Sequence, residues 1–382
     1  MIKILLLIDY SSDFDRRLLR GLVQYSKEKG PWLFYRLPTY YIEMYGEQGI
    51  LNWAKEWKAD AIVGKWDNEK MDLLKELDIP VVLQNYHHRS ITYSNLTGDY
   101  KETGRMAAQF FIKRMFRNFA YCGVKGVVWS DERREGYQQE VTHAGGYFYC
   151  FESDKQEAEI RADVTSWLQR LPKPVALFCC DDAYALFISE TCKMSGIRIP
   201  EEISLLGVDN DELMCHISDP PISSIELGIE RGGYMMGKLI DMQLKKEYNS
   251  NFNIVIKPIR IELRQSTEKY NIADPHVREV VRYIDNHYTL SNLSIEAMLA
   301  DIPLSRRSIE IKFKQTMKVS IYQYILICRC NLLAGLLLST RRSLRDLSIE
   351  VGFKDYNNVA HIFKKYKNCT PEEYRRKGDT SL

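Results

Sequence analysis

The chain has 382 residues, too many for one compact core and enough for two or three domains. It is 45% hydrophobic and 27% charged, which is the composition of a soluble globular protein. It contains no uninterrupted apolar run of about 18 residues, so the sequence predicts no membrane span. The nine cysteines lack the spacing of a disulfide framework or a zinc site. We therefore expect a cytoplasmic protein that holds no metal and no other cofactor.

The net charge of +2 conceals an asymmetry along the chain. From His276 onward there are 18 basic and 11 acidic residues, a surplus of +7. The residues before His276 comprise 35 basic and 40 acidic residues, or −5. A basic C-terminal region joined to an acidic body predicts a polyanionic partner for that region.

Short apolar runs alternate with amphipathic stretches over residues 1–267. The runs predict strands at 3–8, 60–64, 80–84, 119–123, 175–180 and 203–208. The stretches between them predict helices at 15–29, 100–116, 155–170 and 182–195. This alternation predicts right-handed βαβ units, with parallel sheets covered by helices on both faces. No small-residue cleavage site follows the first run, which favours a buried strand over a signal peptide.

The pattern changes near Ser266. The polar segment 268–275 ends in Pro275 and predicts a linker. From residue 276 to residue 382 only helical periodicity continues, which predicts an all-α domain.

The first part of this domain has the pattern of a helix–turn–helix motif. Ser294 is placed to cap a helix of about 295–301, and Pro303 breaks that helix. Ser305 is placed to cap a second helix of about 306–316.

The same pattern occurs a second time closer to the C-terminal end. Gly352 stands where a helix ends and the chain turns, and Asp355 is a candidate N-cap for the helix that follows. Val359, Ile362 and Phe363 would point inward from that helix.

Between the motifs, residues 321–340 predict one helix of about 30 Å, close to the 34 Å of one turn of B-DNA. A stiff helix of this length would hold two recognition helices in successive segments of the major groove.

Residues of about 276–376 resemble the AraC/XylS family of bacterial transcription activators. The resemblance is carried by Gly352-Phe353, by Phe363-Lys364-Lys365, and by Thr370-Pro371 followed, after two intervening residues, by Tyr374-Arg375. It implies a homodimer on DNA half-sites and activation of transcription, and it leaves contact with RNA polymerase open. The chain departs from the family pattern at Pro303, Ser348, Val359 and His361, which changes the expected base preference and not the fold.

The residues that face outward on the two recognition helices are the expected DNA contacts. Arg306 or Arg307 is expected to read a base in the first motif, and Asn357 or His361 in the second, because arginine suits guanine and asparagine suits adenine. The full set is Ser305, Arg306, Arg307, Glu310, Lys314, Tyr356, Asn357, His361, Lys364 and Lys365.

Residues of about 1–267 resemble the sugar-binding core of the LacI/GalR regulators, which has the fold of periplasmic binding proteins. Residues 177–187 and 199–225 carry the resemblance. It implies two lobes, which we expect at about 1–118 with 224–248, and at about 119–223 with 249–267. The predicted fold is thus a two-lobed α/β sensor followed by an all-α domain with two helix–turn–helix motifs.

The resemblance also implies a set of sugar contacts. In parallel α/β sheets, ligands bind beyond the carboxyl ends of the strands. The candidates that follow predicted strands are Asp209, Asp181, Arg133, Asn85 and Trp66, with Asp13 and Asp15 as further candidates.

Most of these side chains have a structural alternative. Asp209 would cap the segment after it, and Asp181 would cap the helix 182–195. Arg133 would form a surface ion pair with one of its glutamate neighbours, and Trp66 would pack in the core.

The body lacks the sequence marks of an enzyme. No GxGxxG follows a strand, no P-loop or GxSxG occurs, and His87-His88 lack a third ligand. We therefore predict a regulator that binds DNA in response to a sugar, an activator of a pentose (xylose-like) operon. An enzyme-like body, or one that binds a small molecule other than a sugar, remains the alternative.

Overall fold

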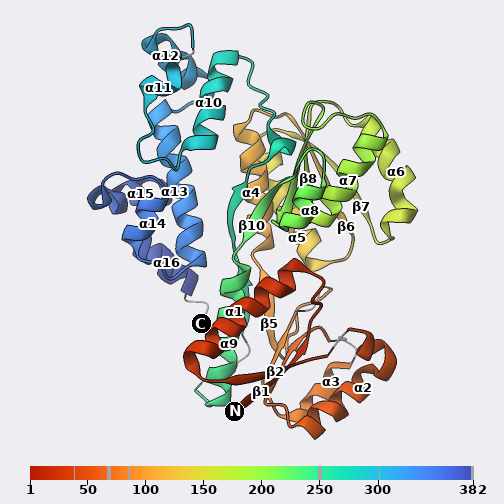
Figure 1. Cartoon of the computed structure of the whole chain (residues 1–382). Coiled ribbons are helices and arrows are strands. Elements are labelled where there is room, and N and C mark those ends of the chain that lie inside the picture. The colour runs from red at the N-terminus through yellow and green to blue at the C-terminus, as the bar shows by residue number, and fades with distance from the viewer. Residues whose placement is uncertain (38, 67–69, 85–86, 248–251, 301, 380–382) are drawn as a thin grey trace.

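The computed structural model describes residues 1–37, 39–66, 70–84, 87–247, 252–300 and 302–379. Two α/β lobes lie end to end, and the C-terminal helices stack along one side of them (Figure 1).

The first lobe is built on a parallel six-stranded sheet with the order β11-β5-β4-β3-β1-β2. Its strands are β1 (Ile2–Leu7), β2 (Trp32–Arg36), β3 (Ala61–Gly64), β4 (Val81–Leu83), β5 (Ser94–Gly98) and β11 (Asn253–Ile256). Its helices are α1 (Asp13–Lys29), α2 (Thr39–Trp57), α3 (Met71–Leu74), η2 (Lys75–Leu77) and α9 (Ile229–Leu244). The central strands are apolar along their length because both faces of the sheet are covered.

The second lobe repeats this plan with the order β12-β10-β9-β8-β6-β7, in which only β12 is antiparallel to its neighbour. Its strands are β6 (Asn118–Val124), β7 (Tyr147–Ser153), β8 (Val175–Cys179), β9 (Ile203–Asp209), β10 (Ser223–Leu227) and β12 (Pro258–Glu262). Its helices are α4 (Tyr100–Lys113), α5 (Val128–His143), α6 (Glu157–Arg170), α7 (Asp182–Met194), α8 (Glu212–Ile217) and η3 (Gln265–Thr267).

In each lobe, two helices cross with their backbones in contact at a pair of glycines. A Cβ atom on Gly104 of α4 would lie 2.0 Å from the carbonyl oxygen of Arg133 in α5, and one on Gly136 of α5 would lie 2.0 Å from that of Lys101 in α4. Gly21 of α1 and Gly233 of α9 make the equivalent crossing in the first lobe, at 1.8 and 1.9 Å. Glycine is required there because a side chain would collide with backbone.

The predicted lobe boundaries are wrong at three elements. Helix α4 packs on α5 and belongs to the second lobe, so the first crossing falls near residue 99 instead of 118. Strand β10 pairs with β9 in the second lobe, and β11 pairs with β5 in the first, the reverse of the expected assignment. The chain thus passes between the lobes three times, near residues 99, 228 and 257.

The C-terminal domain is helical, as expected. It contains α10 (Pro275–His287), α11 (Ile295–Leu299), α12 (Arg306–Met317), α13 (Ile321–Ser339), α14 (Leu344–Glu350), η4 (Tyr356–Asn358), α15 (Val359–Lys367) and α16 (Pro371–Asp379). The predicted caps are confirmed: Ser294 accepts from the backbone N–H of Ala297, Ser305 from that of Ser308, and Asp355 from that of Asn357. Asp355 starts the short η4, which runs on into α15, so the predicted second recognition helix has a 3-10 first turn.

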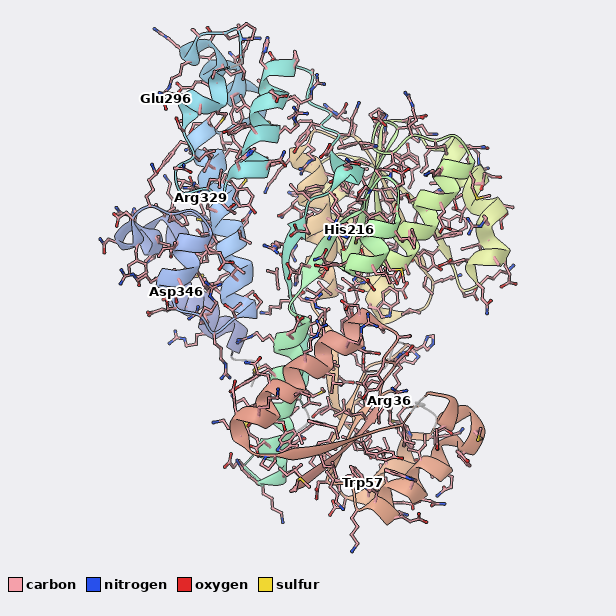
Figure 2. All side chains as sticks on the ribbon, in the orientation of Figure 1. Arg36, Trp57, His216, Glu296, Arg329 and Asp346 are labelled. Carbon is pink, nitrogen blue, oxygen red and sulfur yellow. The ribbon has the colours of Figure 1, made fainter. Side chains whose placement is uncertain are left out.

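Helix α13 is the central element of this domain. It is long and apolar enough to cross a membrane, but 67% of the apolar window is buried inside the protein, as in the core helix of a soluble domain. Arg329, in its middle, donates to the carbonyl oxygens of Tyr288 at 2.7 Å and Leu290 at 2.9 Å, and its guanidinium lies 5.8 Å from the ring centroid of Phe353. Arg329 therefore joins the turn after α10 to Phe353 of the second helix–turn–helix motif, and Figure 2 places it between Glu296 and Asp346.

The expected linker is packed against both domains. Residues 268–274 form no helix or strand, but Tyr270 and Ile272 are buried with the first motif. The backbone N–H of Asn271 donates to the carbonyl oxygen of Arg114 at 2.8 Å. The polar composition of the segment did not predict this packing, because only two of its side chains, Tyr270 and Ile272, are buried in the core of the first motif.

Candidate functional site

A cavity of about 200 Å³ lies between the two lobes, beyond the carboxyl ends of strands of both sheets. Three predicted residues, Arg133, Asp181 and Asp209, line it from the second lobe. Its remaining lining residues are Ser12, Phe14, Gln84, Leu96, Thr97, Tyr100, Trp129 and Ile256. Cavities for drug-sized ligands measure about 300–1,000 Å³, so this one suits a smaller molecule.

Arg133 lies at the base of the cavity and is 3% exposed. The crossing of α4 and α5 holds its backbone in place, because Gly104 packs directly on it. Its Nη1 donates to the carbonyl oxygen of Cys180, and its Nη2 lies 3.4 Å from Oδ1 of Asp209. Its Nε is buried and has no hydrogen-bond partner among the described residues. A ligand oxygen that accepted from Nε would satisfy this donor.

The alternative for Arg133, a surface ion pair with a neighbouring glutamate, is wrong. Glu132 pairs with Arg89 of the first lobe at 2.6 Å, and Glu135 pairs with Lys101 at 2.9 Å.

Asp209 ends β9 with φ at +100°, in the left-handed region that residues other than glycine seldom adopt. Its carbonyl oxygen accepts from Nη1 of Arg17 at 2.9 Å, a contact that reaches across from the first lobe. Burial raises the pKa of its carboxyl, and the charges of Arg133 and Arg17 oppose that rise. The alternative that Asp209 caps the following helix is wrong, because Asp211 caps α8. A strained residue held at a cavity is the usual sign of a functional position.

Asp181 combines the two roles that the sequence left open. Its Oδ1 accepts from the backbone N–H of Tyr184 at 2.7 Å and so caps α7. Its side chain also lines the cavity. Burial raises the pKa of the Asp181 carboxyl to about 6, with the charge of Asp209 adding to the rise.

The other predicted contacts that the structure describes do not line the cavity. Trp66 is 6% exposed, packs in the core of the first lobe and donates from Nε1 to the carbonyl oxygen of Lys70 at 3.0 Å, so its core alternative holds. Asp13 begins α1 and pairs with Arg16 at 3.4 Å. Asp15 is buried and accepts from the backbone N–H of Asp9 at 3.1 Å. Asn85 lies outside the described residues.

The sequence analysis missed all eight of the remaining lining residues, of which Gln84, Trp129 and Tyr100 bear most on the chemistry of the cavity. Gln84 follows β4 directly, one residue before the predicted Asn85, and its buried Oε1 has no hydrogen-bond partner among the described residues. Trp129 stands one helical turn before Arg133 on α5, and the Arg133 guanidinium lies 5.4 Å from its ring centroid. The same guanidinium also lies 5.4 Å from the ring centroid of Tyr100. The spacing of four residues between Trp129 and Arg133 was the available signal for the tryptophan.

Contacts across the mouth of the cavity hold the lobes together. Arg89 donates to both carboxylate oxygens of Glu132, at 2.6 and 2.8 Å. Nδ1 of His87 lies 3.0 Å from the carbonyl oxygen of Gly126. Since each pair joins one lobe to the other, these contacts favour the arrangement of the lobes that the structure has.

The candidate nucleic-acid interface is formed by α12 in the first motif and by η4 with α15 in the second. Ile309 and Phe313 of α12 are buried, as are Val359 and Phe363 of α15, which fixes the opposite faces outward. Of the predicted DNA contacts, Glu310 is partly buried and the rest are exposed: Ser305, Arg306, Arg307, Lys314, Tyr356, Asn357, His361, Lys364 and Lys365. Nothing in the fold occupies these side chains with core packing.

Arg306 is held at the start of α12 by two carboxylates. It pairs with Glu296 at 2.6 Å and with Glu310 at 2.9 Å. Glu296 lies at the outer edge of the domain (Figure 2). The two glutamates fix the orientation of an arginine fork that suits the edge of a guanine.

Comparison with known proteins matches both parts of the chain. A family model described as a periplasmic binding protein-like domain matches residues 108–267, and one described as a helix-turn-helix domain matches residues 299–377. The chain is 25% identical to the xylose operon regulatory protein of Escherichia coli (strain K12), over 98% of this chain and 96% of the relative. It is 26% identical to the protein of the same name from Haemophilus influenzae, over 98% of each chain.

Two solved structures share the fold. The structure of the xylose-binding transcription activator xylR has a TM-score of 0.60 and 23% identity, and covers 98% of both chains. A LacI-type regulator from Alkaliphilus metalliredigens, complexed with D-xylulofuranose, has a TM-score of 0.57 and 17% identity, and covers 70% of this chain and 98% of its own. One part of the chain therefore matches a periplasmic binding protein-like domain and another part a helix-turn-helix domain, and the chain resembles the xylose operon regulatory proteins over nearly its whole length.

Proposed function

We propose that this protein is a sugar-responsive, sequence-specific DNA-binding transcription regulator, and that it activates a pentose utilisation operon. The observation that carries the proposal is the cavity between the lobes, which presents Arg133, Asp181 and Asp209 together in a chain that also carries two exposed recognition helices. The relatives' names make D-xylose the first sugar to test.

The cavity has the chemistry that a monosaccharide needs. Carboxylates accept hydrogen bonds from hydroxyl groups, and Asp181 and Asp209 offer two from one side. The buried Nε of Arg133 would donate a hydrogen bond to an oxygen of the sugar. Trp129 and Phe14 supply apolar surface for the C–H face of a sugar ring.

The sugar acts by closing the lobes, because residues of both line the cavity. A ligand shifts such an equilibrium only by its differential affinity for the two arrangements. In a cytoplasmic homodimer, closure changes how the two helical domains sit on neighbouring half-sites and how they meet RNA polymerase.

An enzyme-like body receives no support from Cys180, the thiol next to Asp181 of the cavity. Cys180 is fully buried, and burial raises the pKa of its thiol well above the ordinary value. A buried thiol of raised pKa forms little thiolate and is a poor nucleophile.

Two measurements on the full chain test the proposal. Calorimetry with a panel of pentoses and hexoses should give saturable binding of one pentose, and the bound sugar should be recovered unchanged. Anisotropy with a labelled fragment of the promoter next to the gene should then show tighter binding with that sugar. Turnover of the sugar would favour an enzyme, and binding of none of the panel would favour another small molecule.

A further inference from the structure

Helix α13 lies across both lobes of the sensor. Its C-terminal part rests on β12 of the second lobe, where a Cβ atom on Gly335 would be 2.0 Å from the carbonyl oxygen of Ile259. Its C-terminal end, at Leu338 and Ser339, packs with Gly232 and Ile256 of the first lobe around a small cavity of about 40 Å³. One rigid helix of the DNA-binding domain thus contacts two bodies that can move relative to each other.

The attachment to the second lobe is buried and polar. Nη2 of Arg114, at the end of α4, pairs with Oδ2 of Asp285 in α10 at 2.8 Å, and both side chains are less than a tenth exposed. The hydroxyls of Tyr270 and Tyr324 donate to the same carboxylate at 3.0 and 3.1 Å. These contacts contain no residue of the first lobe, so rotation of that lobe leaves them in place.

The attachment to the first lobe is a surface contact just beyond α13. Nη1 of Arg341 donates to the hydroxyl oxygen of Tyr234 in α9 at 2.9 Å, and the guanidinium lies 4.4 Å from the ring centroid of the same residue. The Tyr234 hydroxyl in turn donates to Oε2 of Glu28 in α1 at 2.7 Å. A cation, a tyrosine and a carboxylate are therefore aligned from the DNA-binding domain into the first lobe.

We propose that the Arg341–Tyr234 contact is the sensor by which the DNA-binding domain detects closure of the lobes. The inference rests on the proposed function. Since the domain is fixed to the second lobe, Tyr234 meets Arg341 only over a limited range of angles between the lobes, and we assign the closed state to the angle of this structure, at which Arg89 also joins the lobes. The contact adds stability to the closed lobes and the present pose of the domain together. By linkage, whatever favours that pose, such as operator DNA, strengthens sugar binding by the same factor.

The experiment measures the coupling between the two ligands in the full chain. Sugar affinity is determined by calorimetry with and without saturating promoter DNA, with D-xylose as the first probe, and the ratio is the coupling factor. Arg341→Met keeps the aliphatic stem and removes the charge. It should reduce the coupling factor about two- to fivefold, the range of an exposed cation–π contact. Tyr234→Phe should reduce it by less, because the ring remains.

Arg342→Met is the matched control, since Arg342 pairs with Glu350 inside the DNA-binding domain and should leave the coupling factor unchanged. The double variant Arg341→Met with Tyr234→Phe should behave as Arg341→Met alone if the two side chains act through one contact. An unchanged coupling factor in Arg341→Met, with the wild-type chain coupled, overturns the inference. Absence of coupling in the wild-type chain overturns the proposed function instead.

Discussion

Asp209 bears both the strain and the charge of the candidate sugar site. Its φ of +100° is costly for an aspartate and cheaper for an asparagine, which tolerates the left-handed region well. Asp209→Asn therefore removes the charge with little change in backbone strain, whereas Asp209→Ala alters both.

We expect Asp209→Asn to weaken sugar binding at least about tenfold, because a hydrogen bond to a charged group contributes about 1.5–3 kcal/mol. DNA binding without sugar should persist, since the recognition helices lie in another domain. Calorimetry and thermal melting decide the case. Unchanged sugar affinity would remove Asp209 from the site, and a large loss of melting temperature would make it a structural residue.

Asp181 predicts a pH dependence. Its carboxyl, with a pKa of about 6, is protonated in acid and becomes a charged acceptor as the pH rises. Charged acceptors make the stronger bonds to hydroxyls, so sugar affinity should rise through about pH 6 and then level off. Asp181→Asn should bind more weakly and show a smaller pH dependence. An identical pH profile in this variant would assign the titration to another group.

The stability of the sugar-free chain should follow the opposite trend. Since the pKa of Asp181 is raised from 3.8 in the folded chain, the folded state holds the proton more tightly than the unfolded state. The free energy of unfolding should therefore fall as the pH rises from 3.8, the ordinary pKa of an aspartate, to about 6, the pKa of Asp181 in the folded chain. Thermal melting across this range, compared with Asp181→Asn, measures the contribution.

Of the five charged candidates, the structure brings Asp181, Asp209 and Arg133 to the cavity and leaves Asp13 and Asp15 out of its lining. Asp181, Asp209 and Arg133 follow strands or lie on a helix beside them, and the topology brings them to one cavity. Trp66 also follows a strand, but its ring packs in the core of the first lobe and its Nε1 donates to the carbonyl oxygen of Lys70. Position along the chain gives the edge of the sheet at which a side chain lies, but not the side to which it points.

Arg329 is the residue on which the packing of α13 with its neighbours depends. Its two hydrogen bonds to backbone carbonyls join the end of α10 to α13, and its guanidinium reaches the second motif. Burial lowers the pKa of this arginine, which means that burial disfavours its charged form. The hydrogen bonds to the two carbonyl oxygens offset this desolvation.

Arg329→Met should lower the free energy of unfolding of the helical domain by about 1.5–3 kcal/mol, because the carbonyl oxygens of Tyr288 and Leu290 lose a charged donor. The measurement is urea unfolding, with Arg345→Met as the control, since Arg345 is an exposed residue of α14. Equal midpoints for the two variants would mean that Arg329 contributes nothing to the junction.

The elements were more predictable than their assignment to lobes. Periodicity and caps placed α12 and α13 within a residue or so of the structure. Nothing in the residues of β11 distinguishes an edge strand of one sheet from an edge strand of the other, because both positions need the same apolar pattern. The sheet to which β11 belongs is decided by its pairing with β5, which is distant in the sequence.

The surplus of positive charge in this chain lies in the domain that carries the recognition helices. If about five phosphates are neutralised, the logarithm of DNA affinity should fall against the logarithm of salt concentration with a slope near −4.5. Anisotropy with the full chain over a sixfold range of salt, roughly 50–300 mM, measures the slope. A flat response would contradict binding through the phosphate backbone. Lys364→Gln, which removes one exposed cation of α15, should reduce the slope by about one.

The glycine crossings of the two lobes affect how a mutational map of this protein would have to be interpreted. Gly21, Gly233, Gly104 and Gly136 touch no ligand, yet any larger side chain there would force two backbones apart. In a scan scored by reporter expression, these four positions would be as intolerant as the sugar contacts. Abundance scored in parallel would separate the two classes, because the glycine variants would lose protein from the cell and the cavity variants would lose only the response.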